Sequence, residues 1–239
     1  MATSLTKSDR FEQLGEKKNV PNSLLTAIKV RIRYYRSSVP LPGLVPQVLF
    51  DVLAKMGLLI LPYHLVAEGM RNAGPRPSAG KLAEYEFGFL GPHDMKAIAN
   101  IPGRRLSLAQ LLSTLQEGKL CFGAQYRGEV VAFTWCNLTE GTLWSHRVFP
   151  LKEHEAYLFD AYTLEHFRGI GIAPYLRYRC YEELAKLGRD QCYSITAVWN
   201  APAARFKEKL GAQVLELGIL VSLFRRWRFH VRLRDYTRG

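Results

Sequence analysis

Hydrophobic and polar residues follow regular patterns from about residue 83 to residue 233, and these patterns switch between the periods of strands and of helices. Strands are predicted at 84–90, at 120–138 as a hairpin turning at Arg127-Gly128, at 155–164, at 192–199, and at 212–233 as a pair. Helices are predicted from Gly91, over 106–118, from Gly171 to Leu187, and over 201–211. This order of elements predicts a mixed α/β domain.

The residues before this domain have a different character. A polar tail (1–22) precedes a segment of mixed apolar and basic residues (23–36) that fits an amphipathic helix, and a linker (71–81) leads into the domain. We therefore divide the chain into a basic and apolar N-terminal extension, partly helical, over 1–80 and a domain over 81–239.

The segment 47–70 is the most apolar part of the extension. Its longest uncharged run, 56–67, is too short for a transmembrane helix, which needs about 20 apolar residues. Two interpretations are open. The segment packs onto the domain as an additional helical layer, or it lies on a membrane surface as an interfacial helix supported by the basic residues of 23–36.

Composition indicates a folded protein of the cytoplasm. Of the 239 residues, 48% are hydrophobic and 23% are charged, which is typical of a globular chain. The four cysteines lie in apolar patterns without CxxC or CxH spacing, so we expect reduced core residues, no disulfide framework and no metal site. The polar N-terminus lacks the apolar core of a signal peptide, so we expect the cytoplasm, with the inner face of the membrane as the alternative place.

The net charge of +12 is concentrated at the two ends of the chain. Residues 1–80 hold 11 Lys and Arg against 5 Asp and Glu, and residues 221–239 hold 6 against 1, whereas the middle is nearly neutral. Such ends favour an acidic partner, such as anionic lipid, nucleic acid or a phosphorylated substrate, or they are a solvated surface without a specific partner. Nucleic acid is disfavoured, because neither a helix-turn-helix nor an RNP pattern is present.

The sequence "EHFRGIGIA", which joins strand 155–164 to the next helix, carries the first candidate chemistry. Backbone N–H groups at a helix N-terminus attract anions, and glycines remove the Cβ atoms that would keep an anion away. The stretch 168–173 can therefore hold a pyrophosphate, although a tight turn without a ligand would use the same residues. It is neither a Walker loop nor a dinucleotide fingerprint, because GK[ST] and G-x-G-x-x-G are absent.

Two stretches of the domain contain characteristic residues at set spacings. One predicted helix and one predicted strand lie between the two stretches. "RGIGIA" has Arg168, Gly171 and Ala173 in an R/Q-x-x-G-x-G/A pattern, and "NAPAARFKEKLGA", starting at Asn200, follows an N-x-x-(A/S)-x-x-F-(Y)-x-K-L-G-F pattern. Together they resemble the motifs of the GNAT superfamily of N-acetyltransferases over roughly 83–233. The resemblance implies a GNAT-like α/β fold: a mixed, mostly antiparallel central sheet flanked by helices, here with an N-terminal helical extension.

The resemblance implies acetyl-CoA, or another acyl-CoA, as the cofactor. The glycine turn would hold its pyrophosphate, and the end of strand 155–164 would bond the pantetheine arm and the thioester carbonyl. Asn200 would also reach the pantetheine, a role compatible with capping the helix that follows it. The implied cofactor-binding residues are Tyr162, Thr163, Leu164, Arg168, Gly169, Ile170, Gly171, Ile172, Ala173, Asn200 and Phe206.

Acyl transfer to an amine requires a general base. Glu155 lies thirteen residues before Arg168, a position similar to the glutamate of the family's histone-acetylating branch. Asp160 lies nearer the expected thioester in an apolar strand, where burial would raise its pKa towards a useful value. Strand alternation predicts that the two carboxylates lie on opposite faces, so that only one faces the substrate. His146 and His154 are further candidates.

The residue expected to protonate the leaving thiolate differs from the one in the family pattern. Many members have a tyrosine after the position of Phe206, but this chain has Lys207. A lysine can stabilise a thiolate by its charge. Alternatively it points to solvent, and Tyr193 or a water would replace the tyrosine. Lys207 joins Glu155 and Asp160 as the catalytic candidates.

These observations predict an N-acyltransferase that moves an acetyl group from acetyl-CoA to a primary amine of a small acceptor. The basic ends suggest an acidic or membrane-linked acceptor, such as an amino sugar, and contact of the N-terminal extension with an anionic membrane surface. The alternatives are a long-chain acyl transferase, with 47–70 lining a tunnel, and a non-catalytic CoA-binding or membrane-docking module.

Overall fold

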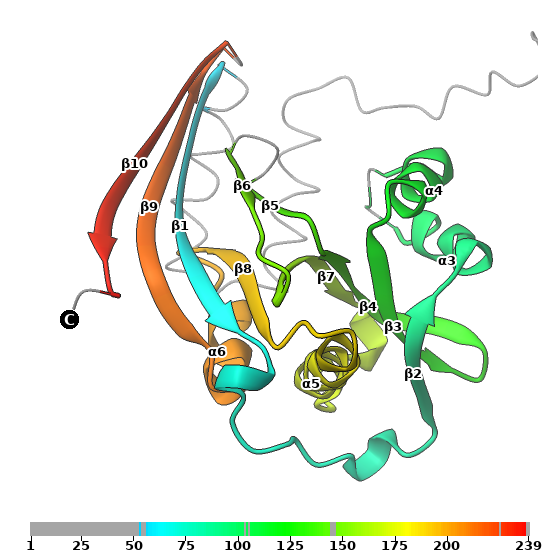
Figure 1. The fold of residues 1–239 in the computed structure, drawn as a ribbon. Coiled ribbons are helices and arrows are strands. Elements are labelled where there is room, and N and C mark those ends of the chain that lie inside the picture. Colours follow the sequence, from blue (N-terminus) through cyan, green and yellow to red (C-terminus); the bar gives the residue numbers. More distant parts are fainter. Residues whose placement is uncertain are drawn as a thin grey trace, which may run out of the picture.

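A central eight-stranded sheet organises the chain (Figure 1). The computed structural model describes residues 53, 56–102, 104, 106–143, 147–224 and 226–237, so the helix predicted at 23–36 lies outside the described residues. From one edge to the other, the strands are β10 (Trp227–Asp235), β9 (Gln213–Leu223), β1 (Leu58–Glu68), β8 (Gln191–Ala197), β7 (Glu155–Thr163), β4 (Glu129–Asn137), β3 (Leu120–Tyr126) and β2 (Tyr85–Leu90). All neighbours are antiparallel except β7 and β8, which are parallel.

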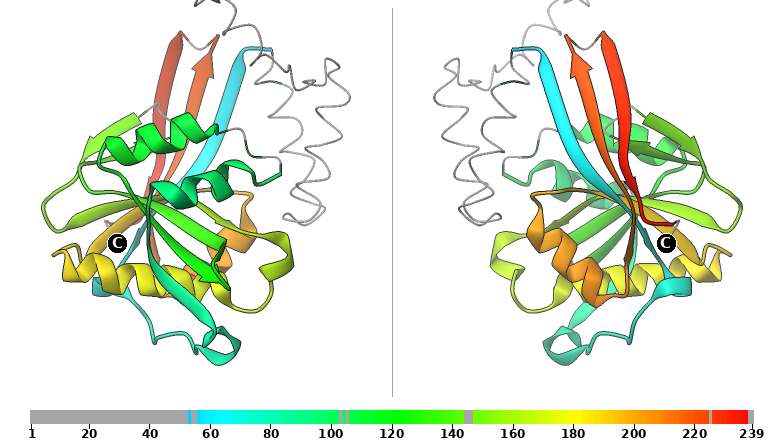
Figure 2. Two further views of the ribbon diagram at one scale, coloured as in Figure 1. Left: turned by 90° about the vertical axis from the view of Figure 1, so that its right-hand side faces the viewer. Right: turned by 90° about the vertical axis from the view of Figure 1, so that its left-hand side faces the viewer.

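Helices cover both faces of the sheet (Figure 2). The α-helices are α3 (Met95–Ala99), α4 (Leu108–Gln116), α5 (Ile172–Lys186) and α6 (Ala201–Lys209). α3 and α4 pack on one face and α5 packs on the other. A separate hairpin of β5 (Glu140–Leu143) and β6 (Arg147–Pro150) was not predicted. The architecture confirms the expected mixed, mostly antiparallel α/β fold.

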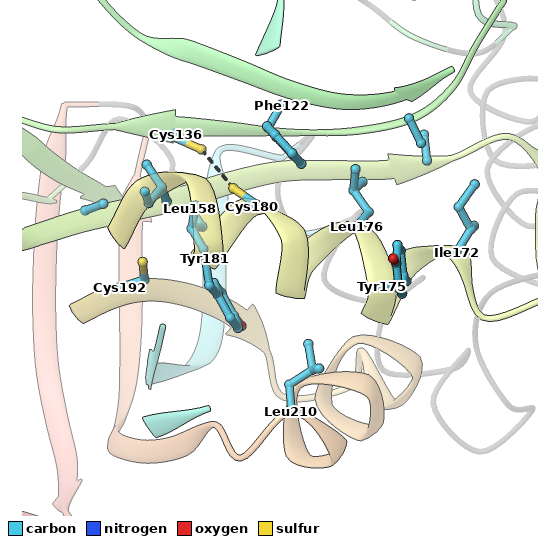
Figure 3. Packing of buried hydrophobic residues seen from close by; sticks show 14 of the residues in the cluster. Phe122, Cys136, Leu158, Ile172, Tyr175, Leu176, Cys180, Tyr181, Cys192 and Leu210 are labelled. Carbon is cyan, nitrogen blue, oxygen red and sulfur yellow. Dashed lines mark hydrogen bonds between the residues drawn. The ribbon is translucent and has the colours of Figure 1, made fainter. Parts of the chain in front are cut away.

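The largest buried cluster joins α5 to the sheet (Figure 3). Ile172, Leu176 and Cys180 recur every four residues, so they share the face of α5 that packs on the sheet. Phe122 of β3 and Leu158 of β7 lie in the same cluster. The four cysteines are free and buried, as predicted from their apolar surroundings. This packing holds the N-terminus of α5 at the end of β7.

The central position of β1 contradicts the division between an N-terminal extension and a domain beginning at residue 81. We expected 47–70 to form a helical layer or an interfacial helix, but its described residues 58–68 form a strand between β8 and β9. Tyr63 pairs with β8 on one side and with β9 on the other. Because both faces of β1 are at least half-buried, its sequence is a continuous apolar run, which does not distinguish a strand from a buried helix.

The far ends of three strands project from the body as an arm (Figures 1 and 2). β8 pairs with β1 only from Tyr63 onward, so the first residues of β1 pair with β9 alone, and β9 pairs in turn with β10. We call Leu58–Pro62, Ile219–Leu223 and Trp227–Val231 the three-stranded arm. It points away from α5 and α6 in both figures. None of the helices among the described residues has the length and apolar character that a membrane crossing requires.

Candidate functional site

β7 and β8 separate after a short parallel pairing. The paired positions run from Glu155 with Gln191 to Leu158 with Ser194, and beyond them β7 stays paired with β4 while β8 stays paired with β1. In the described part of the chain, the main-chain groups of 159–163 that face β8 therefore have no strand partner. They include Tyr162 and Thr163, two of the residues that the resemblance assigned to the pantetheine arm.

Asp160 lies in a β-bulge where the two strands separate. Asp160 and Ala161 together oppose the single Thr134 of β4, and Asp160 has a φ of 46°. Its carboxylate forms a two-pronged ion pair with Arg104, from the loop between α3 and α4. We expected Asp160 to be buried in an apolar strand, but 33% of its side chain is exposed. The bulge explains the difference, because it turns Asp160 out of the regular packing of the strand.

Arg104 is a site residue that sequence analysis missed. Its side chain is only 10% exposed, and its guanidinium lies over the rings of Phe133 (4.9 Å) and Tyr162 (5.8 Å). Its Nε has no hydrogen-bond partner among the described residues. Nothing in the local sequence distinguishes Arg104 from other loop arginines, so only the fold reveals its contact with Asp160.

Glu155, the other candidate base, begins β7 and is buried. Its Oε1 accepts a hydrogen bond from the Tyr193 hydroxyl (3.1 Å), and its Oε2 accepts one from the backbone N–H of Lys152 (2.8 Å). Burial and the Glu155 carboxylate raise the pKa of Tyr193 to about 12, so this hydroxyl keeps its proton at neutral pH. His154 lies 3.8 Å from Glu155, and His146 lies outside the described residues.

The two carboxylates lie on the same side of the sheet, contrary to strict alternation. Tyr157, two residues after Glu155, stacks on Phe159, which stacks on Trp135 in the cluster beneath α3 and α4. Asp160 reaches this side through its ion pair with the loop between those helices. The bulge is the cause, because it adds one residue to β7 relative to β4.

The glycine turn between β7 and α5 has the conformation of an anion site. Gly169 and Gly171 have φ values of 82° and 88°, which favour glycine, and a Cβ atom at either position would meet open space. Gly171 is the N-cap of α5, and no side chain caps the first turn of the helix. The N–H groups of that turn therefore lack a capping partner in the described structure and are available to an anion.

A pocket of about 310 Å³ lies at the glycine turn. It is lined by Thr163, Arg168, Gly169, Gly171, Ile172, Ala173, Pro174, Pro202, Arg205, Phe206 and Lys209. Arg168 is held in place, because its Nε donates to the carbonyl oxygen of Thr163 (3.1 Å). Sequence analysis missed Arg205 and Lys209 as binding residues, although two cations four residues apart on a helix are a signal for one charged face.

The remaining predicted cofactor residues lie beside the pocket and do not line it. The ring of Tyr162 stacks on a phenylalanine of β4, and the N–H of Leu164 donates to a carbonyl of β4. Ile170 is exposed at the turn. Asn200 caps α6, because its Oδ1 accepts a hydrogen bond from a backbone N–H of the first turn (3.2 Å).

Lys207 points from α6 into the interior, where it joins a cluster of charged side chains. Its Nζ donates to the hydroxyls of Ser194 (2.7 Å) and Thr196 (2.6 Å) on β8. The same Nζ lies 4.0 Å from a carboxylate oxygen of Glu68 on β1, and Arg177 of α5 lies 3.7 Å from the other oxygen. The alternative that Lys207 points to solvent is therefore wrong.

The charged cluster shifts the protonation of its members. Burial lowers the pKa of Lys207 to about 8, although the negative charge of Glu68 raises it in part. Burial of Glu68 acts to raise its pKa, but the positive charges of Arg177 and Lys207 outweigh this effect and lower it. The cluster thus pairs a carboxylate that stays charged with an amine that loses its proton near pH 8. Ser194 places this amine where β7 and β8 separate.

The sequence profile of the acetyltransferase (GNAT) family matches residues 92–212, just over half of the chain. The chain belongs to the GNAT acetyltransferase family. The match contains the glycine turn and the stretch from Asn200 to Gly211, but not β1 with Glu68. A comparison with curated proteins gives no match.

Solved GNAT structures share the fold at low sequence identity. A GCN5-related N-acetyltransferase from Sphaerobacter thermophilus is 14% identical with a TM-score of 0.50, and the alignment covers 81% of this chain and 59% of that one. The GCN5-related glucosamine N-acetyltransferase region of a fungal multi-domain beta-N-acetylglucosaminidase is 15% identical with a TM-score of 0.50, over 76% of this chain and 22% of that one. The chain thus spans less than two thirds of either protein, and these likenesses concern the fold alone.

Proposed function

We propose that this GNAT protein is an N-acyltransferase that moves an acetyl group from acetyl-CoA to the primary amine of a small acceptor. The pocket at the glycine turn carries the proposal. It combines the N–H groups of the first turn of α5 with three cationic side chains, Arg168, Arg205 and Lys209. CoA is rich in phosphate, and both kinds of group bind phosphate.

The residues of the pocket fit an acyl-CoA. The main chain of 169–173 would hold the pyrophosphate, and Arg205 and Lys209 would bind a further phosphate. The main-chain groups of 159–163, which lack a partner on β8, would bond the pantetheine arm. When bound, the cofactor supplies an acyl group activated as a thioester.

Lys207 suits the role of acid for the leaving thiolate, in place of the family's tyrosine. Its Nζ lies beside Ser194, where the strands separate and the thioester would lie. Its pKa of about 8 is close to that of an ordinary thiol, about 8.5, so its proton can pass to the thiolate at little cost. Glu68 would help Lys207 to keep this proton until the carbon–sulfur bond breaks.

Asp160 is the carboxylate best placed to receive the acceptor amine. It is partly exposed at the point of separation, whereas Glu155 is buried; each carboxylate already accepts two hydrogen bonds, so exposure decides between them. Asp160 would take the amine proton directly or through water. The basic ends of the chain support an acidic amine as the acceptor, such as a membrane-linked or phosphorylated amino sugar.

Calorimetric titration with acetyl-CoA tests the proposal. The wild type is compared with Gly171→Asp, which adds a negative charge at the N-terminus of α5, and with Gly188→Asp just beyond its C-terminus. The two glycines are matched, because both have a left-handed φ and open space around the Cβ position. We expect Gly171→Asp to weaken binding by about tenfold or more and Gly188→Asp to leave it unchanged.

A screen of primary amines then measures the release of the CoA thiol. Equal binding by the wild type and Gly171→Asp would contradict the proposed site. Binding without turnover of any amine would favour a non-catalytic CoA-binding module. Turnover of long-chain acyl-CoA but not of acetyl-CoA would favour a long-chain acyl transferase.

A further inference from the structure

Three large apolar side chains are exposed at the end of the three-stranded arm. The exposed fractions are 70% for Met56, 68% for Phe224 and 58% for Trp227. Met56 lies just before β1. Phe224 lies in the turn from β9 to β10, and Trp227 begins β10. The backbone N–H of Phe224 donates to the carbonyl oxygen of Gly57, which joins the two regions. We call Met56, Phe224, Arg226 and Trp227 the arm tip.

Phe224 is an unusual residue for the turn that it occupies. Its φ is 49°, in the left-handed region that glycine, asparagine and aspartate adopt most easily. A polar residue there would relieve the backbone and keep an apolar ring out of water. Strained residues and exposed apolar patches both concentrate at functional surfaces, so the combination indicates that the ring has a partner.

Phe224, Arg226 and Trp227 of the arm tip belong to a strongly basic stretch of the sequence. Residues 221–239 contain six arginines and one aspartate, and Arg226 of the tip is exposed. Aromatic rings with neighbouring arginines match a membrane surface, because the rings insert at the level of the headgroups while the cations bind anionic lipid.

We propose that the arm tip docks this protein on an anionic lipid bilayer. Five residues of β1 extend beyond its pairing with β8, so the arm is about 15 Å long. The interfacial layer of one leaflet is only about 5–8 Å thick, so the tip reaches the acyl chains while the body stays in water. The arm points away from α5 and α6 (Figure 2), and the pocket at the glycine turn is lined by residues from the start of α5 and from α6.

A second copy of the chain suits this surface less well. β10 is an edge strand, so its outer main-chain groups lack a partner strand in the described sheet. Antiparallel pairing of β10 with its own copy would set the exposed Arg234 of each strand against the basic residues of the other, whereas Arg232 is already paired with Glu216 and Asp235. Like charges on opposed strands destabilise a sheet, whereas lipid phosphates neutralise them.

Flotation of the full chain with phospholipid vesicles tests the proposal. Vesicles of phosphatidylcholine alone are compared with vesicles that also contain phosphatidylserine, at low and high salt. The double variant Phe224→Ser/Trp227→Ser removes the apolar tip, and Arg226→Glu reverses its charge. Leu187→Ser and Lys96→Glu are the matched controls, because they make the same kinds of change at exposed positions elsewhere.

We expect the wild type and both controls to bind vesicles that contain phosphatidylserine, and salt to weaken this binding. The double variant and Arg226→Glu should each lose about tenfold or more of the vesicle partitioning. All variants should bind acetyl-CoA like the wild type, because no altered residue lines the pocket. Failure of docking is therefore distinguishable from failure of the proposed function.

Three outcomes would overturn the proposal. The first is the absence of vesicle binding by the wild type. The second is equal binding by the wild type and the tip variants, or binding that does not depend on phosphatidylserine. The third is that the wild type is a dimer in analytical ultracentrifugation, that the double variant is a monomer, and that vesicles change neither state. This result would assign the tip to a second copy.

Discussion

At the scale of single residues, the buried Lys207 is coupled to the charge of Glu68. When Lys207 is protonated, its cluster holds two positive charges and only the negative charge of Glu68. Charging Lys207 in this dry environment is unfavourable, which is why its pKa falls to about 8. A tyrosine at this position would need no counter-ion. Lys207 and Glu68 are therefore best understood as a pair.

The lowered pKa of Lys207 predicts a pH dependence of folding stability. The lysine titrates near pH 8 in the folded protein and near pH 10.4 in the unfolded chain. Between these values the unfolded chain binds more protons, so the contribution of Lys207 to the free energy of unfolding rises with pH, by up to about 3 kcal/mol. Below pH 8 the lysine is charged in both states and adds no slope.

Urea unfolding of the wild type and of Lys207→Met from neutral to alkaline pH measures this contribution. Methionine leaves Glu68 paired with Arg177, so we expect the variant to fold. The difference in the free energy of unfolding, wild type minus variant, should rise as the pH increases above 8. A difference that stays constant with pH would show that the pKa of Lys207 is not lowered.

The candidate site residues differ in how far the sequence could predict them. Gly171 and Asn200 lie in contiguous motifs on predicted element ends, so their roles at the turn and at the cap of α6 could be read locally. Glu68 and Arg104 reach the site only through tertiary contacts with residues distant in sequence. The exposure of Asp160 depends on a β-bulge that the local sequence pattern does not predict.

At the scale of elements, the end of β1 depends on a close contact that only glycine permits. Gly69 has a φ of 109°, and a Cβ atom there would lie 2.6 Å from the carbonyl oxygen of Asp190 and 2.8 Å from the backbone nitrogen of Cys192. We expect Gly69→Ala to lower the free energy of unfolding by about 3 kcal/mol or more, because backbone atoms cannot easily move aside. Chemical denaturation measures the loss.

Gly188→Ala is the matched control for this substitution. Gly188 has a φ of 78°, but a Cβ atom there would meet open space. Only the local strain of a left-handed alanine remains, about 1 kcal/mol. Equal losses from the two substitutions would show that the close approach at Gly69 does not hold β1 in place.

Helices and strands whose own residues show a clear period and a turn or end residue were predicted, and the others were missed. The hairpin of β3 and β4 was located by its turn at Arg127-Gly128, and α5 by its apolar spacing and by Gly188. β1 was missed because a strand covered on both faces loses its alternation. β5 and β6 have only four residues each, too few to show a period.

At the scale of the whole molecule, the sheet contains a central strand, β1, that lies outside the region matched by the GNAT profile. Residues 70–239 contain the entire region matched by the GNAT profile, yet they lack β1. We expect 70–239 to show no cooperative unfolding, whereas 53–239 should unfold in one transition. Without β1, the edges of β8 and β9 lose their shared partner, and Lys207 and Arg177 lose Glu68. Urea denaturation followed by circular dichroism compares the two, and a sharp transition of 70–239 would contradict this expectation.

The central place of β1 also has a consequence during synthesis. β1 is the first of the eight strands to leave the ribosome, but both of its neighbours, β8 and β9, emerge more than 120 residues later. At about 5–20 residues per second, this apolar strand waits roughly 6–30 s for its partners. During that time β1 cannot pair with either of its neighbours in the sheet. The middle of the sheet therefore forms only after β8 and β9 have been made.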